Sequence, residues 1–263
     1  MKVATWNINE CVGITCNLDN QKTVNTVNYG NIDEIVKKIN EYDFDVVCFQ
    51  EYPVLIDGEK KLTNRIITET NLKYYEAYDT YDSYLFNGGR VGVAVFSKYE
   101  IKDSFKTQFA NPDMVKTGSN GVVYHSVDKA IIKIVVSVDG EEYAIITGHA
   151  IAFAPYGKTE FDYPESYKPL EELMMSSKEA NIIALGDFNS EKIFEIMPSI
   201  ASRFTDVVET ATTKDYYEKT GEIQRDYILI NGGLACDRKT KLDNYSDHYI
   251  ICASIAKKLE MTR

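Results

Sequence analysis

The chain has 263 residues, of which 44% are hydrophobic and 26% are charged. This is the composition of a globular protein with a sizeable core, and no linker-like, low-complexity or repeated segment divides it, so we expect a single domain over residues 1–263. The formal net charge of −11 disfavours nonspecific binding of long nucleic acids. A bound divalent cation can nevertheless make the electrostatic potential inside a binding site positive. The lack of any run near about 18 apolar residues excludes a membrane-spanning helix.

The N-terminal segment MKVATWNI has the alternation of a strand and lacks the long hydrophobic run of a secretory signal, which favours a cytoplasmic location. The five cysteines, at positions 11, 16, 48, 236 and 252, do not form the closely spaced pairs of a zinc site. We therefore expect free thiols.

Segments rich in Val, Ile and aromatic residues predict strands at 2–8, 44–50, 91–97, 128–138, 142–150, 181–187, 225–231 and 249–255. Helices are expected at 31–42, 60–71 and 164–177, where Pro169 limits the start of the last one. The Asp139-Gly140 turn joins two antiparallel strands. Long strands that alternate with helices, in this number, predict an α/β sandwich of two mixed sheets packed face to face.

Three polar segments without regular periodicity, residues 10–30, 104–127 and 153–168, are expected to be long loops. Long ordered loops often border functional sites, and the aromatic residues of the last two would suit the rim of a substrate site. An irregular surface without function explains each of them equally well.

Polar side chains follow many of the apolar runs, at the point where each predicted strand meets its neighbouring loop. Any one of them has a structural explanation, such as a turn, a strand cap or a satisfied core histidine. Their coincidence is better explained if the strand ends converge on one acidic pocket that holds two of the three histidines. These residues are Asn7, Asn9, Glu51, His149, Asp187, Asn189, Asp226, Asp247 and His248.

Such a set suits metal-assisted hydrolysis of a phosphoester. Oxygen ligands such as Glu51 match a hard cation like Mg²⁺, whereas zinc would require more His or Cys. Asp187 can orient and deprotonate a water, a histidine can donate to the phosphate, and Asp226 can hold that histidine in its useful tautomer.

The motifs WNIN, FQE, GVAVFSK, ITGH, LGDFN and SDH, in this order from about residue 3 to 255, resemble the endonuclease/exonuclease/phosphatase superfamily. The resemblance implies a four-layer sandwich of two mixed sheets between helices, with one active site at the sheet edges. It places Asn7 and Glu51 at a divalent cation, with Glu51 the principal ligand and Asp247 beside the metal. Mg²⁺ is the expected ion, and Mn²⁺ is a candidate substitute.

By the same resemblance, Asp187 orients or activates the attacking water with help from Asn189. His248, paired with Asp226, contacts the scissile phosphate, and His149 contacts the phosphate or the leaving group. Asn9 stands where some members have an acidic residue, which leaves a second metal ligand in doubt. Trp6 is expected in the core rather than as a base-stacking platform, and His125 is given no function.

The function implied is a Mg²⁺-dependent phosphoesterase that hydrolyses a phosphodiester bond. A histidine at position 149 is typical of the deoxyribonuclease and sphingomyelinase-like branches rather than of abasic-site endonucleases. Nuclease-type activity is slightly favoured, with nucleic acid among the candidate substrates, because the lipid diesterases of this family are commonly exported and the sequence shows no export signal. The alternative is a phosphodiesterase or phosphatase that acts on a lipid headgroup or a small phosphorylated molecule. A catalytically silent binding module of the same fold would lack some of the residues that contact the metal, the water or the phosphate. All the candidate residues are present in this sequence.

Overall fold

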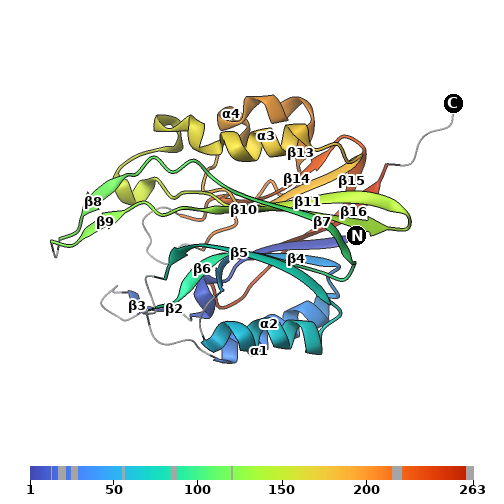
Figure 1. The fold of residues 1–263 in the computed structure, drawn as a ribbon, viewed down its shortest axis with the longest axis horizontal. Coiled ribbons are helices and arrows are strands. Elements are labelled where there is room, and N and C mark those ends of the chain that lie inside the picture. The colour runs from blue at the N-terminus through green and yellow to red at the C-terminus, as the bar shows by residue number, and fades with distance from the viewer. Residues whose placement is uncertain are drawn as a thin grey trace.

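The computed structural model describes residues 1–12, 14–16, 22–24, 29–54, 57–83, 88–119, 121–214 and 221–258. Two six-stranded sheets stack face to face, and helices cover the outer face of each sheet (Figure 1). This arrangement confirms the predicted four-layer α/β sandwich. In the described part of the chain, no helix is both long and apolar enough to cross a bilayer.

The first sheet has the strand order β15-β16-β1-β4-β6-β5. Strands β1 and β4 run parallel, and the other neighbours run antiparallel. Its strands are β1 (Lys2–Asn7), β4 (Val46–Pro53), β5 (Tyr74–Asp82), β6 (Arg90–Ser97), β15 (Leu234–Leu242) and β16 (Ile250–Lys257).

The second sheet has the strand order β13-β14-β12-β11-β10-β7, with β11 and β12 parallel and the other neighbours antiparallel. Each sheet is therefore mixed and carries one central parallel pair. The strands are β7 (Ile101–Gln108), β10 (Ala130–Val138), β11 (Glu141–His149), β12 (Asn181–Asp187), β13 (Phe204–Asp206) and β14 (Asp226–Asn231).

Helices α1 (Tyr29–Tyr42) and α2 (Asp57–Glu69) cover the first sheet, and α3 (Lys168–Ser176) and α4 (Ile193–Ile196) cover the second (Figure 1). Helix α1 packs inward through Ile32, Ile35 and Ile39, which recur at helical spacing and are all buried. Short 3₁₀ turns join the elements: η1 (Asn9–Cys11), η2 (Ala154–Tyr156), η3 (Glu160–Asp162), η4 (Pro164–Tyr167) and η5 (Pro198–Ser202).

All of the predicted strands and helices are present, but several boundaries and loop assignments were wrong. The helix expected at 164–177 begins at Lys168, because Pro169 fits only the first turn of an α-helix and the preceding residues form the 3₁₀ turn η4. The segment 104–127, expected to be a loop, completes strand β7 and then forms a hairpin of β8 (Val115–Thr117) and β9 (Val123–His125). Its sequence hid these strands because most of their side chains face solvent and show no apolar alternation.

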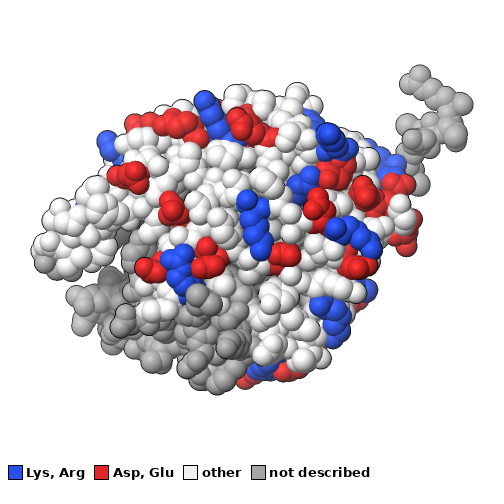
Figure 2. Space-filling model, viewed as in Figure 1, with Lys and Arg blue, Asp and Glu red and all other residues white. Residues whose placement is uncertain are grey.

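The hairpin of β8 and β9 extends away from the body of the molecule (Figure 1), and the corresponding lobe in Figure 2 is almost free of charge. The segment 10–30, also expected to be a loop, contains η1 and a second small hairpin of β2 (Ile14–Cys16) and β3 (Lys22–Val24). Its residues 13, 17–21 and 25–28 lie outside the described residues. The third expected loop, 153–168, consists largely of the turns η2 to η4.

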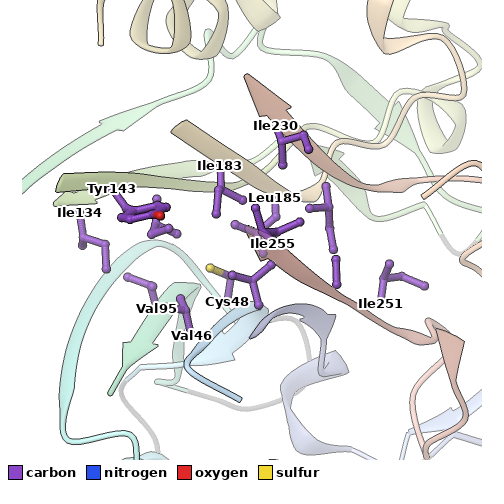
Figure 3. Close-up of a cluster of buried hydrophobic side chains, with 14 of the residues drawn as sticks. Val46, Cys48, Val95, Ile134, Tyr143, Ile183, Leu185, Ile230, Ile251 and Ile255 are labelled. Atoms are coloured by element: carbon purple, nitrogen blue, oxygen red, sulfur yellow. The ribbon is translucent and has the colours of Figure 1, made fainter. Parts of the chain in front are cut away.

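The central core lies between the two sheets (Figure 3). Val46, Cys48 and Val95 of the first sheet pack toward Ile183 and Leu185 of the second. Further apolar clusters fill the space between each sheet and its helices, and Trp6 belongs to the one beneath α1, which confirms its expected core position. The thiols of Cys11, Cys48, Cys236 and Cys252 are free as expected, and the side chain of Cys16 lies outside the described residues.

Candidate active site

The polar residues at the strand ends meet at one edge of the two sheets. Asn7 is the register partner of Gln50 at the ends of β1 and β4, and Asp187 is the partner of both His149 and Asp226 in the second sheet. Just before these ends, a Cβ added to Gly186 would lie only 2.3 Å from the carbonyl oxygen of Gly148. The glycine of the GDFN motif therefore lets β11 and β12 present His149 and Asp187 side by side.

The carboxylate of Asp187 is the point on which three donor side chains converge. Its Oδ2 lies 3.2 Å from Nδ2 of Asn7, 3.5 Å from Nε2 of His149 and 3.7 Å from Nε2 of His248. Its Oδ1 accepts the backbone N–H of Asn189 at 3.0 Å. Asp187 is only 1% exposed, and burial raises the pKa of its carboxyl to about 6, against the opposing charge of His248.

His248 is held by a buried carboxylate. Its Nδ1 lies 2.8 Å from Oδ2 of Asp226, which is fully buried at the first residue of β14. Burial lowers the pKa of His248, but the negative charges of Asp226 and Asp187 outweigh this effect and raise the pKa well above its ordinary value. His248 is therefore an imidazolium at neutral pH.

His149 has the opposite protonation state. Burial, followed by the positive charges of Lys129 and His248, lowers its pKa well below the ordinary value. Its Nδ1 lies 3.4 Å from Nζ of Lys129, so the ring accepts at Nδ1 and carries its hydrogen on Nε2, which faces Asp187. One site thus holds a charged and a neutral histidine against the same carboxylate.

Glu51 owes its direction to a bulge in β4. The register between β4 and β6 shifts between Gln50 and Tyr52, and the backbone of Glu51 has φ of 50°. Gln50 and Tyr52 on either side are fully buried, whereas Glu51 is partly exposed. The bulge therefore turns the Glu51 side chain out of the core, and its charge acts on Lys129.

Several hydrogen bonds hold the GDFN segment, residues 186–189, at the end of β12. Asn189 has φ of 47° and donates from Nδ2 to the carbonyl oxygen of Ala150 at 3.0 Å. Arg225 donates to the carbonyl oxygen of Asn189, and the Tyr167 hydroxyl donates to that of Phe188, both at 2.8 Å. These contacts fix the side chains of the loop before any ligand binds.

A sequence profile of the Endonuclease/Exonuclease/phosphatase family matches residues 4–248. The chain belongs to the endonuclease/exonuclease/phosphatase family. This result confirms the resemblance inferred from the motifs. Members of this family are phosphoester hydrolases that use divalent metal ions, and the chain is accordingly a hydrolase of phosphoester bonds. A comparison with curated proteins found no significant match.

Solved structures share the fold of this family member at low sequence identity. An endonuclease/exonuclease/phosphatase from Beutenbergia cavernae DSM 12333 has 14% identity and a TM-score of 0.72, and the match covers 98% of this chain and 71% of that one. The catalytic domain of human Nocturnin with a bound sulfate anion has 17% identity, a TM-score of 0.66 and coverage of 98% and 93%. The mannosyl-6-phosphatase Bt3783 of Bacteroides thetaiotaomicron VPI-5482 has 14% identity, a TM-score of 0.61 and coverage of 97% and 99%.

Among the described residues of this family member, Asp187, Asp226 and His248 form a cluster that could hold a metal ion, since one ligand atom from each lies within 4.8 Å of the others. Glu51 and Asp247, which the sequence assigned to the metal, are not in this cluster. Asp247 accepts from the Ser246 hydroxyl at 3.2 Å, and its negative charge contributes to the raised pKa of His248. Asp247 therefore lies near His248.

Sequence reasoning missed three buried polar residues at this edge. Lys129 lies directly before β10, within the strand predicted at 128–138, and Gln50 directly precedes Glu51, but the sequence analysis gave neither residue a role. Glu10 lies in the turn η1, where Asn9, Glu10 and Cys11 all have positive φ, and its carboxylate accepts from the Ser83 hydroxyl. Only the pairing of distant strands shows that these side chains are buried beside the site.

Proposed function

We propose that the chain is a Mg²⁺-dependent phosphoesterase that hydrolyses a phosphodiester bond, with its catalytic centre at Asp187. The observation that carries the proposal is the convergence of Asn7, His149 and His248 on one carboxylate oxygen of Asp187. The three donors can bind the phosphoryl group of a substrate. The carboxylate at their centre can bind the attacking water next to that group.

Asp187 acts as the general base. Its raised pKa, about 6, makes the carboxylate a better proton acceptor near neutral pH than an ordinary aspartate. The carboxylate accepts a hydrogen bond from the attacking water and takes its proton as the water oxygen bonds to phosphorus. The fixed position of Asn189, whose backbone N–H holds Oδ1 of Asp187, leaves Oδ2 directed into the pocket.

The two histidines have different tasks because they hold different protonation states. His248, kept as an imidazolium by Asp226, donates to a phosphoryl oxygen or protonates the leaving oxygen when its bond to phosphorus breaks. His149 stays neutral and donates from Nε2, which orients the phosphoryl group without supplying a proton.

Glu51 and Asn7 are the side chains that we assign to Mg²⁺, with Asp247 nearby. Their donors are oxygens, which suit a hard cation, and Glu51 turns toward the pocket from its bulge. The alternative cation site is the cluster of Asp187, Asp226 and His248, where a bound metal would require His248 to give up its proton. When bound, the cation withdraws charge from the phosphoryl and leaving oxygens.

The physiological substrate has two candidate classes. Nuclease-type activity is the first candidate, because His149 is present at the position that resembles deoxyribonucleases. The second candidate, a small or lipid-derived phosphoester, is favoured by the net charge of −11 and by the mixing of Lys and Arg with Asp and Glu on the face shown in Figure 2. A mannosyl-6-phosphatase among the structures with this fold also favours it.

The test measures hydrolysis of bis-p-nitrophenyl phosphate with Mg²⁺, with Mn²⁺ and with excess chelator. We expect metal-dependent turnover that falls at least about 100-fold in Asp187→Ala and His248→Ala. His125→Ala is the matched control, because His125 lies on the exposed hairpin strand β9. Equal turnover in all four proteins would refute the assigned roles.

A substrate panel then separates the two classes. It contains plasmid DNA, abasic duplex, RNA, sphingomyelin, inositol phosphates and a sugar phosphate, each assayed with and without chelator. Cleavage of a nucleic acid with little turnover of the others supports the first class. The reverse result supports the second.

A further inference from the structure

Lys129 is a buried cation at the active-site edge, and the proposed reaction as described above does not use it. It directly precedes β10 and is only 9% exposed. Its carbonyl oxygen accepts the backbone N–H of Phe109 at 2.9 Å, so the backbone is fixed at the junction of β7 and β10. A buried ammonium is costly unless its charge and its donors are satisfied.

The protein satisfies only part of this requirement. Nζ of Lys129 lies 3.4 Å from Nδ1 of His149 and 4.2 Å from the centre of the Tyr81 ring. An ammonium has three N–H donors, of which His149 accepts one, and the aromatic face provides a nonspecific cation–π contact. Within the described ranges, no carboxylate forms a direct ion pair with Lys129.

The charges around Lys129 are mostly negative. Burial lowers the pKa of Lys129, and the negative charges of Glu51, Asp187 and Glu10, in that order of strength, oppose this effect. These carboxylates come from three different elements, β4, β12 and η1. Lys129 is therefore a positive charge among acidic side chains, in contact with His149.

We infer that Lys129 is a substrate-binding residue that donates to a non-bridging oxygen of the phosphoryl group while its contact with Nδ1 of His149 keeps the Nε2 hydrogen directed at the same group. The inference rests on the proposed function as a phosphoesterase. It adds to that function a fixed cation that attracts the phosphate into an acidic pocket and holds it independently of the bound metal. It also makes Lys129 a positioning residue for His149.

The experiment measures binding of inorganic phosphate by calorimetry in the presence of Mg²⁺, together with hydrolysis of bis-p-nitrophenyl phosphate. The variants are Lys129→Met, which keeps an unbranched side chain about one atom shorter but removes the charge, and Lys129→Arg, which keeps the charge. The matched control is Lys102→Met, which removes the same charge from an exposed position on β7. Thermal unfolding checks that each variant is folded, and because Lys129→Met relieves a buried charge, we expect it to fold.

For Lys129→Met we expect the dissociation constant for phosphate to rise roughly 10- to 100-fold, the effect of losing a charged hydrogen bond. Lys129→Arg should recover part of this loss, and Lys102→Met should bind like the unmodified protein. In ¹⁵N NMR spectra, the ring of His149 should shift away from the Nε2–H tautomer in Lys129→Met.

Phosphate binding to Lys129→Met at unchanged affinity would overturn the inference, and intact hydrolysis by the unmodified protein would then leave the proposed function standing. Conversely, Lys129-dependent binding of phosphate by a protein that hydrolyses none of the substrates would support the inference and refute the proposed function. A loss of binding in Lys129→Met that occurs equally in Lys102→Met would also overturn the inference, because it would reflect net charge alone.

Discussion

Nδ1 of His248 lies 2.8 Å from Oδ2 of Asp226, and Oδ1 of this buried carboxylate has no hydrogen-bond partner in the described part of the chain. The charge of Asp226 is therefore balanced chiefly by one imidazolium. Removing one member of such a pair leaves the other buried and uncompensated. The pair thus sets the proton affinity of His248 and ties it to the end of β14.

Replacement of Asp226 by Asn should remove this control. We expect the pKa of His248 to fall because its largest favourable charge is lost, and kcat to fall about 10²- to 10⁴-fold, the usual contribution of a positioned acid or base. NMR titration of the His248 ring and hydrolysis of bis-p-nitrophenyl phosphate measure the two effects. Asp206→Asn is the control, since Asp206 lies on β13 and binds Gln224 and the loop backbone instead. A normal kcat in Asp226→Asn would contradict the role of the pair.

Replacement of Asp187 by Asn should stabilise the metal-free protein while it abolishes hydrolysis. The folded-state pKa of about 6 exceeds the ordinary value of 3.8, so the folded protein binds this proton more tightly than the unfolded chain does. The free energy of unfolding of the unmodified protein should therefore fall as the pH rises from about 3.8 to about 6, relative to Asp187→Asn. Above that range, we expect the variant to be more stable by roughly 1 to 3 kcal/mol.

Urea denaturation in excess chelator, at acidic and at mildly alkaline pH, measures this difference. Asp103→Asn, an exposed position on β7, serves as the control and should show no comparable change. Higher stability of the unmodified protein than of Asp187→Asn at alkaline pH would contradict this expectation. It would show that the buried charge of Asp187 does not destabilise the folded protein.

Glu51→Gln should weaken metal binding because it preserves the size of the side chain but removes the charge of the principal proposed ligand. We expect the dissociation constant for Mn²⁺ to rise about 10- to 100-fold, since ligand charge tunes the affinity of oxygen sites for hard cations. Electron paramagnetic resonance of Mn²⁺ measures free and bound ion, and Glu41→Gln on α1 provides the matched loss of charge at an exposed position. Unchanged affinity in Glu51→Gln, with a loss in Asp226→Asn, would place the ion at the Asp187, Asp226 and His248 cluster instead.

The positions of Asn7, His149, Asp187 and Asp226 illustrate what the sequence can predict. Each stands at the end of an apolar run, and the runs are long enough to be recognised as strands. The two parallel pairs, β1 with β4 and β11 with β12, then bring strand ends to one edge. Local pattern and simple topology were sufficient to predict that these side chains come together.

Lys129 and strand β7 illustrate what the sequence cannot predict. Strand β7 reads IKDSFKTQ and is mostly exposed at the edge of its sheet, so pairing with β10 rather than an apolar pattern makes it a strand. Lys129 is buried because β5, β10 and β11 meet around it, as its contacts with Tyr81 and His149 show. Burial of a charged residue is a tertiary property, and a charged residue before an apolar run gives no local sign of it.

Gln50 joins the two sheets directly behind the site. It is fully buried, its Oε1 accepts from the Thr5 hydroxyl at 3.1 Å, and its Nε2 donates to the Thr147 hydroxyl at 3.3 Å. Thr5 belongs to the first sheet and Thr147 to the second, so Gln50 links the strand that carries Glu51 to the strand that carries His149.

Gln50→Leu should therefore affect both stability and metal-dependent catalysis. Leaving the two threonine hydroxyls without this partner should cost about 1 to 3 kcal/mol of unfolding free energy. Without Gln50, the position of Glu51 relative to His149 is less well fixed. The Mg²⁺ concentration for half-maximal activity should therefore rise, and kcat should fall. Urea denaturation and Mg²⁺ titrations of activity measure these effects, with Thr147→Val as a control that removes one contact of Gln50 and leaves its bond with Thr5. A variant that is destabilised but has unchanged Mg²⁺ dependence and kcat would show that the bridge supports the fold alone.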